Sequence, residues 1–199
     1  MKQFDRVLQR WRIRQAAKQL PSGLRLIDVG AYQGELFDYL GGRLNSGFGI
    51  DPLLPGRREA ARYVIESGHF PAVRPREAGW DAITMLAVLE HIPSSEQTVV
   101  AEACHGLLRP GGRVVITVPS RAVDGILRVL KWLCVIDGMS LEEHHGFDPA
   151  ATGEIFAPPR FRLLHHSRFQ FGLNHLYVFE ALPGPRPFAP PAAAATDSR

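Results

Sequence analysis

Several features are scarce in this chain of 199 residues, and each absence narrows what the protein can be. The two cysteines, Cys104 and Cys134, lie among apolar residues and lack the spacing of metal ligands. We expect them to be reduced core thiols of a cytoplasmic protein, because disulfides are rare in that compartment. No apolar run approaches the ~20 residues of a membrane span, and the first residues lack the apolar centre of a signal peptide. The sequence therefore predicts a soluble protein without a metal site.

Net charge is also low. The total of +3 is too small on its own to indicate a nucleic-acid-binding protein. Residues 1–20 contain six basic side chains and one acidic one, a net charge of +5, so the rest of the chain sums to −2. The basic character is confined to one segment, and we expect no nucleic-acid partner.

What the chain does contain is an alternation of strand and helix patterns. Helices are expected at residues 2–20, 33–40, 57–67, 94–107, 123–136 and 150–156. Strands are expected at residues 25–29, 47–51, 70–73, 81–87, 113–118, 161–168 and 174–182. The last two strands are joined by so few residues that they must be antiparallel neighbours. The others, separated by helices, predict a mixed sheet that is parallel over most of its width.

Three helices have features that can be checked. The first would bury an apolar stripe of Phe4, Val7, Leu8 and Trp11. Ser94 and Gln97 have the spacing of a capping box, at the start of a helix predicted to bury four side chains. These are Val99, Val100, Ala103 and Leu107. Residues 123–136 are apolar on nearly all sides, which predicts a helix covered by the sheet edge, by an apolar acceptor or by another subunit.

Composition divides the chain into three parts. Residues 1–22 form the basic amphipathic helix, and residues 23–182 form the α/β domain. Residues 183–199, rich in proline and alanine, are expected to be a disordered tail.

The stretch from Leu24 to Leu40 is the most informative part of the sequence. An apolar run ends in Asp28 and Gly30 and then opens into a helical pattern, so it predicts a strand, a tight turn and a helix. Such a junction commonly holds an anionic or nucleotide-like ligand. Gly30 and Gly34 fall where the backbone turns sharply and approaches the ligand.

Four motifs in order resemble those of class I S-adenosylmethionine-dependent methyltransferases. They are IDVGAYQG at Ile27–Gly34, GID at Gly49–Asp51, AVLEHI at Ala87–Ile92 and LLRPGGRVVITVP at Leu107–Pro119. The resemblance covers about residues 24–182. It implies a three-layer, Rossmann-like α/β sandwich whose mostly parallel, seven-stranded sheet ends in an antiparallel pair. It also implies S-adenosyl-L-methionine as the cofactor.

The resemblance assigns roles to the cofactor-binding residues. Asp28 would face the amino end of the ligand, although it could instead only brace the turn. Asp51 would accept hydrogen bonds from the ribose diol, with helix capping as the alternative. The implied cofactor-binding set is Asp28, Gly30, Ala31, Tyr32, Gly34, Asp51, Pro52, Leu86 and Ala87.

Two positions depart from the family pattern. Tyr32 stands where the usual loop has a third glycine, and no clear acidic residue follows the third strand to contact adenine, Glu77 being the nearest candidate. These departures keep open a methyltransferase-like binding or scaffold domain without catalysis. A nicotinamide-dependent oxidoreductase is a second alternative, because its fold shares the glycine turns and a ribose-binding acid. It is disfavoured because the loop lacks the G-x-G-x-x-G spacing.

Three histidines are candidate catalytic residues. His91 follows the fourth central strand, near the expected acceptor, and could act as a general base or brace its loop. His144 and His145 lie in a polar loop that would line the acceptor pocket, although an ordinary solvated loop fits equally. Methyl transfer does not require a base, because in-line positioning supplies much of the acceleration. The expected reaction is methylation of a small-molecule or lipid-linked acceptor.

The basic segment bears on partners. Residues 1–20 could be a lid, an oligomer contact or a peripheral contact with anionic membrane lipid, or simply a solvated helix packed on the domain. The sequence leaves the oligomeric state and the acceptor open.

Overall fold

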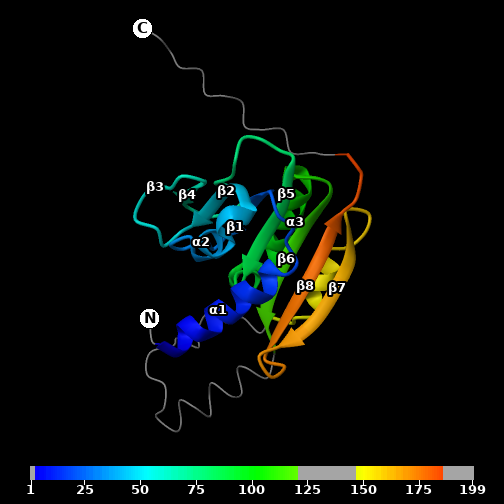
Figure 1. Ribbon diagram of the computed structural model, residues 1–199. Helices are drawn as coiled ribbons and strands as arrows, with labels where there is room; N and C mark the ends of the chain where they lie inside the picture. Colours follow the sequence, from blue (N-terminus) through cyan, green and yellow to red (C-terminus); the bar gives the residue numbers. More distant parts are fainter. Residues whose placement is uncertain (1–2, 121–146, 186–199) are drawn as a thin grey trace.

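A mixed sheet of eight strands forms the centre of the computed structural model, which describes residues 3–120 and 147–185 (Figure 1). The strands are β1 (Leu24–Val29), β2 (Leu44–Asp51), β3 (Arg58–Glu59), β4 (Tyr63–Ser67), β5 (Trp80–Leu86), β6 (Leu108–Pro119), β7 (Phe161–Phe169) and β8 (Asn174–Ala181). Their order across the sheet is β3-β4-β2-β1-β5-β6-β8-β7.

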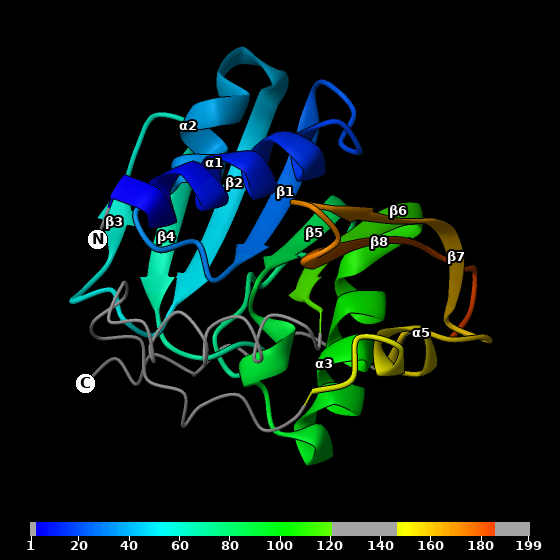
Figure 2. The same cartoon turned by 90° about the horizontal axis from the view of Figure 1, so that it is seen from below.

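Helices cover both faces of this sheet. They are α1 (Gln3–Ala17), α2 (Glu35–Leu40), α3 (Ser94–Leu107) and α5 (Ala151–Ile155), with short 3₁₀ turns η1 (Gly41–Arg43) and η2 (Leu89–His91). Figure 2 shows α1 and α2 over one face and α3 and α5 over the other. The expected three-layer sandwich is confirmed.

Strand directions also agree with the prediction. β1 pairs in parallel with β2 and β5, β2 with β4, and β5 with β6. β8 runs antiparallel to both β6 and β7. The carboxyl ends of β1, β2 and β5 therefore meet along one edge of the sheet, which we call the carboxyl edge.

Two hydrophobic cores hold the layers together, one on each face. In β1, Leu24 and Leu26 pack toward α1 and α2, whereas Ile27 and Val29 pack toward α3. Burial on both faces explains why the central strands are nearly continuous apolar runs rather than alternating ones. Asp28 shares the face of Leu26 by strand parity, so it lies on the side that α1 covers.

Two predicted elements were wrong. Residues 57–67 form β3 and β4 instead of a helix, and residues 70–73 form a turn instead of a strand. Alanine and charged residues favoured the helix, but Tyr63 and Ile65, two apart, are the buried side chains, as in a strand. The short β3 raises the number of strands from the expected seven to eight.

Two local predictions about helices were also wrong. Pro93, not Ser94, is the N-cap residue of α3, and the amide nitrogen of Gln97 donates to the Leu89 and Ile92 carbonyls. Val99 is 46% exposed, whereas the other three predicted core residues of α3 are buried.

In α1 the predicted apolar stripe was correct at Trp11, which is partly buried against the core, and wrong at Val7. Val7 is 59% exposed, and the core side chains come from the second half of the segment. These are Ile13, Ala16, Ala17 and Leu20. The small alanine side chains let the helix lie close to the sheet. The predicted stripe contained only large apolar residues and therefore missed them.

Some predictions concern residues outside the described ranges. These are the helix at residues 123–136, Cys134, His144, His145 and the tail beyond residue 185. Cys104 is a free, buried cysteine, and burial raises the pKa of its thiol. Within residues 3–120 and 147–185, no helix has the length and apolar character to cross a membrane.

Candidate active site

The turn between β1 and α2 requires glycine at two positions. Gly30 has φ +80°, and a Cβ there would lie 2.4 Å from Cγ2 of Val88. Gly34 has φ +88°, and its Cβ would lie 2.9 Å from the Tyr63 ring. Both the left-handed backbone and the close approach exclude a side chain. The predicted sharp turn is present, with Val88 and Tyr63 as the close neighbours, and the approach of these glycines to a ligand stays a prediction.

Tyr32 adopts the conformation that a glycine would favour. Its φ is +44°, its side chain is 40% exposed, and its backbone N–H donates to Oδ2 of Asp51 at 2.8 Å. A non-glycine residue in this region costs about 1–2 kcal/mol. The hydrogen bond offsets part of that cost, so the loop keeps its shape without the third glycine.

Asp51 ties this turn to the end of β2. Its carboxylate is buried and also accepts a hydrogen bond from the Leu53 N–H at 2.8 Å. No helix follows, so helix capping, the alternative weighed for Asp51, does not occur. A carboxylate has about four acceptor sites, so capacity for ligand hydroxyls is left. Pro52, the next residue, is exposed.

Asp28 is a buried acid without a cationic hydrogen-bond partner among the described residues. Oγ1 of Thr84 donates to its Oδ1 at 2.6 Å. Burial raises the pKa of Asp28 to about 7, an effect that the Thr84 hydrogen bond opposes and that nearby Glu35 and Asp51 increase. Asp28 can thus exchange a proton near neutral pH.

A small cavity joins several predicted cofactor residues. It has a volume of about 50 Å³. The predicted residues that line it are Asp28, Gly30, Ala31 and Leu86. Gln9, Arg12 and Ile13 of α1 form the facing wall, and Glu35 and Leu36 complete it. A cavity of this size holds a few water molecules at most.

The end of β5 is held by Thr117, which was not among the predicted site residues. Ala87 has φ +59°, and its N–H donates to the Thr117 carbonyl at 2.9 Å and to Oγ1 of Thr117 at 3.1 Å. Thr84 and Thr117 are each a polar residue within a buried strand. That isolation is the sequence signal that could have identified both.

The loop after β5 contains two ionisable side chains, Glu90 and His91, which differ in burial. Glu90 is buried, His91 is exposed, and Oε2 of Glu90 has no hydrogen-bond partner among the described residues. Burial raises the pKa of Glu90 to about 7, although nearby Arg12 acts in the opposite direction. Glu90, which was not among the predicted catalytic residues, is therefore a buried acid with a strongly raised pKa.

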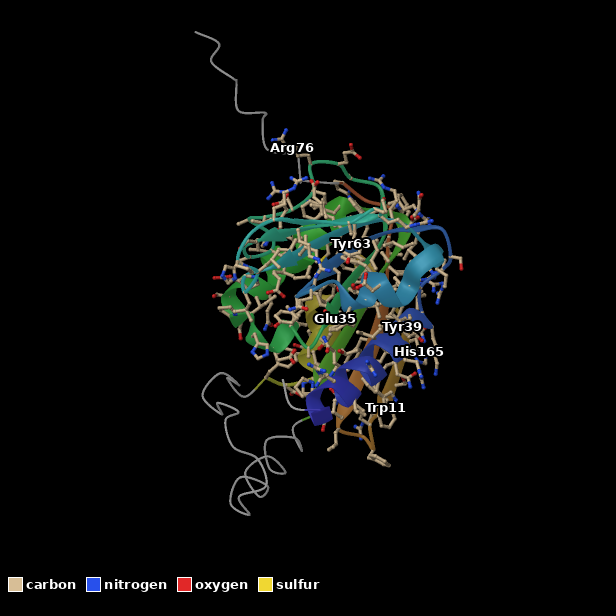
Figure 3. All side chains as sticks on the ribbon, turned by 60° about the vertical axis from the view of Figure 1, so that its left-hand side comes forward. Trp11, Glu35, Tyr39, Tyr63, Arg76 and His165 are labelled. Atoms are coloured by element: carbon tan, nitrogen blue, oxygen red, sulfur yellow. The ribbon has the colours of Figure 1, made fainter. Side chains whose placement is uncertain are left out.

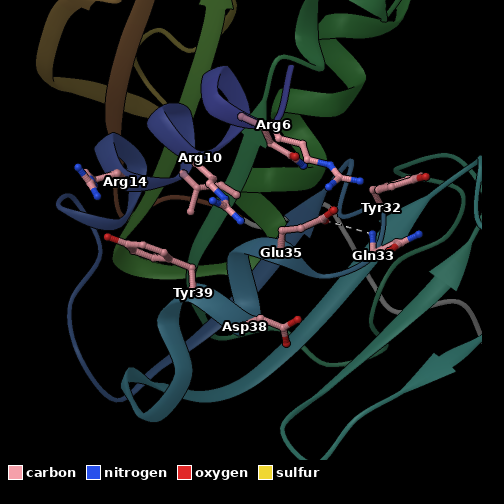
Figure 4. Close-up of a pocket in the computed structure, with 10 residues that line it drawn as sticks. Arg6, Arg10, Arg14, Tyr32, Gln33, Glu35, Asp38 and Tyr39 are labelled. Atoms are coloured by element: carbon pink, nitrogen blue, oxygen red, sulfur yellow. Dashed lines mark hydrogen bonds between the residues drawn. The ribbon is translucent and has the colours of Figure 1, made fainter. Parts of the chain in front are cut away.

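A larger pocket of about 680 Å³ opens beside the small cavity, between α1 and α2. Figure 4 shows Arg6 and Arg10 extending from α1 toward the wall formed by Tyr32, Gln33 and Glu35. Gln9, Ile13 and Glu35 line both spaces, so the two adjoin. The basic helix thus borders the predicted cofactor residues.

Glu77, the nearest acidic candidate for an adenine contact, does not lie at the carboxyl edge. This residue precedes β5 at the opposite edge of the sheet, is 80% exposed and pairs with Arg25 at 3.1 Å. A contact with a ligand at the carboxyl edge is excluded by that position.

Comparisons with known proteins identify the family. The family model described as "Methyltransferase domain" matches residues 2–172. A ubiquinone biosynthesis O-methyltransferase of Xanthomonas axonopodis pv. citri is 31% identical over 116 residues, or 53% of this chain and 47% of that protein. One from Rhodopseudomonas palustris is 27% identical over 195 residues, or 81% and 73%. The chain spans about half the length of most of the curated relatives it matches.

Solved structures share the fold. A putative methyltransferase of Haloferax volcanii, in complex with the activator Trm112, has a TM-score of 0.66 at 14% identity, covering 88% of this chain and 90% of that one. The 1,6-didemethyltoxoflavin-N1-methyltransferase of Burkholderia thailandensis, with bound S-adenosylhomocysteine, has a TM-score of 0.64 at 18% identity, covering 86% and 79%. The chain therefore belongs to the methyltransferase domain family, the class of S-adenosylmethionine-dependent enzymes that its sequence motifs predict.

Proposed function

We propose that this protein transfers the methyl group of S-adenosylmethionine to a hydroxyl oxygen of a small-molecule or lipid-linked acceptor. The observation that carries the proposal is the small cavity, which both Asp28 and Arg12 line. The methionine end of the donor is a zwitterion, with an ammonium and a carboxylate. One acid and one base in a shared cavity complement those two charges.

Other residues fit the remainder of the donor. The glycines at 30 and 34 leave room for the backbone to approach a ligand, and Asp51 retains acceptor capacity for ribose hydroxyls. When bound, the donor supplies an electrophilic methyl on its sulfonium. The contribution of the chain is then to orient the donor and exclude water.

Oxygen is the proposed acceptor atom because the curated relatives are named O-methyltransferases of ubiquinone biosynthesis. A hydroxyl acceptor releases a proton. Glu90, with a pKa of about 7, suits general-base catalysis at neutral pH, and its oxygen Oε2 accepts no hydrogen bond from the described residues. His91, His144 and His145 are the other proposed participants.

Calorimetry with S-adenosylmethionine and S-adenosylhomocysteine tests donor binding. We expect submillimolar affinity in the wild type and a loss of about tenfold in Asp28→Asn and in Arg12→Gln, since each removes one charged contact. Glu77→Gln and Arg76→Gln, exposed residues at the opposite edge, are the matched controls. Absence of binding in the wild type would contradict the proposal.

Transfer itself is tested with a methyl-labelled donor and a panel of phenols, carboxylic acids and amines. Label recovered on phenolic oxygen supports the proposal, and label only on nitrogen or carboxylate contradicts the choice of acceptor. Donor binding without transfer to any acceptor in the panel would favour the non-catalytic alternative.

A further inference from the structure

One side of α1 carries cations and apolar side chains. It comprises Val7, Arg10, Trp11 and Arg14, with Lys18 just beyond the helix end, and the tip of the β7–β8 turn adds Phe171. We call these six residues the docking surface. Arg10 and Arg14 also line the larger pocket, and Trp11 is partly buried against the core. Arg10 and Arg14 are exposed, and neither forms a hydrogen bond or ion pair with any described residue.

Phe171 is the most unusual member of the docking surface. It is 94% exposed at φ +57°, a left-handed conformation that a bulky aromatic residue rarely adopts. Phe171 therefore adds strain to the turn without contributing its ring to the core. An aromatic ring so exposed is available for contact with a partner outside the protein.

The turn and the helix form one unit. The Trp11 and Phe171 rings meet edge to face, with centroids 6.0 Å apart. Gln170 is buried, and its amide nitrogen donates to the Leu8 carbonyl at 2.9 Å, which fastens the turn to α1. The aromatic and cationic side chains are therefore presented together rather than on separately moving segments.

We propose that this surface binds the headgroup layer of a membrane that contains anionic lipid. Arginine and lysine attract anionic headgroups, while aromatic and aliphatic side chains insert at the boundary with the acyl chains. The charge distribution supports this partner, because residues 1–20 carry +5 and the rest of the chain −2. The negative remainder of the molecule would turn α1 toward the membrane.

The docking surface lies near the candidate active site. β8 begins at Asn174, opposite Pro119 at the carboxyl end of β6, so the turn lies near the carboxyl edge. The middle of α1, at Gln9, Arg12 and Ile13, also lines the small cavity at that edge. Docking would bring the candidate active site to the lipid surface. Lipid binding goes beyond the proposed function and does not depend on methyl transfer.

Flotation of the full chain with lipid vesicles tests the proposal. We expect binding to vesicles of phosphatidylcholine with one-third phosphatidylglycerol, weak binding to phosphatidylcholine alone, and release by high salt. Arg10→Gln and Arg14→Gln should each weaken binding about fivefold. Phe171→Ser should weaken it by about tenfold.

Matched controls keep the result specific. Arg76→Gln removes an exposed cation at the other end of the molecule, far from Trp11 in Figure 3. Leu163→Ser removes an exposed apolar residue of β7, 49% exposed and far along the strand from the turn. Both controls should bind as the wild type does. Thermal unfolding of all variants checks that each remains folded.

Three outcomes would overturn the proposal. One is equal binding, or none, to both vesicle types. Another is binding that the control substitutions weaken as much as Phe171→Ser does. The third is self-association without lipid that Phe171→Ser abolishes, which would assign the surface to a second copy of the chain.

Discussion

At the scale of single residues, the turn after β1 requires a glycine, which has no side chain, at position 30. Gly30 leaves no space for a Cβ beside Val88, and Tyr32 next to it keeps a left-handed backbone with the help of Asp51. The turn is thus specified by one glycine and one carboxylate more than by a run of glycines.

Gly30→Ala should disrupt this turn. We expect the free energy of unfolding to fall by about 1–3 kcal/mol, from the added contact and the positive φ, and affinity for S-adenosylhomocysteine to fall at least about tenfold. Gly42→Ala is the control, because its Cβ would meet no atom within 4 Å and its φ is not positive. Chemical denaturation and calorimetry on both variants check this. Equal effects of the two substitutions would show that the turn tolerates a side chain.

At the scale of elements, α1 is held to the domain by more than its apolar side. Nη2 of Arg43 donates to the Ala17 carbonyl at 2.9 Å and to the Leu20 carbonyl at 2.5 Å, so it satisfies groups that a helix end leaves unpaired. Nη1 of Arg113 donates to the Gln19 carbonyl at 2.8 Å. Two arginines from the sheet side therefore fasten the end of this helix.

Arg43→Ala should loosen α1. We expect the free energy of unfolding to fall by about 1–3 kcal/mol, since two carbonyls lose a charged donor. Hydrogen exchange should rise in residues 13–20 more than in α3. Arg76→Ala, which removes an exposed arginine elsewhere, should change neither quantity. Unchanged exchange in Arg43→Ala would mean that Ile13 and its apolar neighbours suffice to hold the helix.

Sequence patterns predicted the elements that bury long apolar runs. β1, β5 and β6 were found because their residues are buried on both faces, and the glycine turn and Asp51 were found from their places at strand ends. β4 was missed because Tyr63 and Ile65 stand in a segment whose composition favours a helix. Glu90 and the α1 wall of the cavity could not be predicted, since burial of a charge and proximity across the sheet arise only on folding.

At the scale of the whole molecule, two buried acids lower stability at neutral pH. Burial raises the pKa of Asp28 and of Glu90 to about 7 in the folded state, so these groups keep their protons there to a higher pH than in the unfolded chain. The unfolded state therefore loses protons first as pH rises from about 4 to 7. The free energy of unfolding falls through that window and this contribution is constant above it.

Asp28→Asn should reduce that decline. Between pH 4 and pH 7 the free energy of unfolding should fall by about 2–4 kcal/mol less in the variant than in the wild type. Asn can still accept the Thr84 hydrogen bond, which keeps the comparison clean. Denaturation at several pH values measures it. Parallel pH curves for the two proteins would show that Asp28 ionises normally.

The strand order also has a consequence for the chain during its synthesis. β1 precedes every other strand of the sheet in the chain, yet it lies in the interior of the sheet, between β2 and β5. β1 cannot complete its pairing with β5 until Leu86 has left the ribosome. β6 cannot complete its pairing with β8 until Ala181 has been made. Until then the apolar faces of Leu26 and Ile27 are without a full cover. β8, the last strand in the chain, is inserted between β6 and β7, so the two parts of the sheet are joined only after Ala181 has been made.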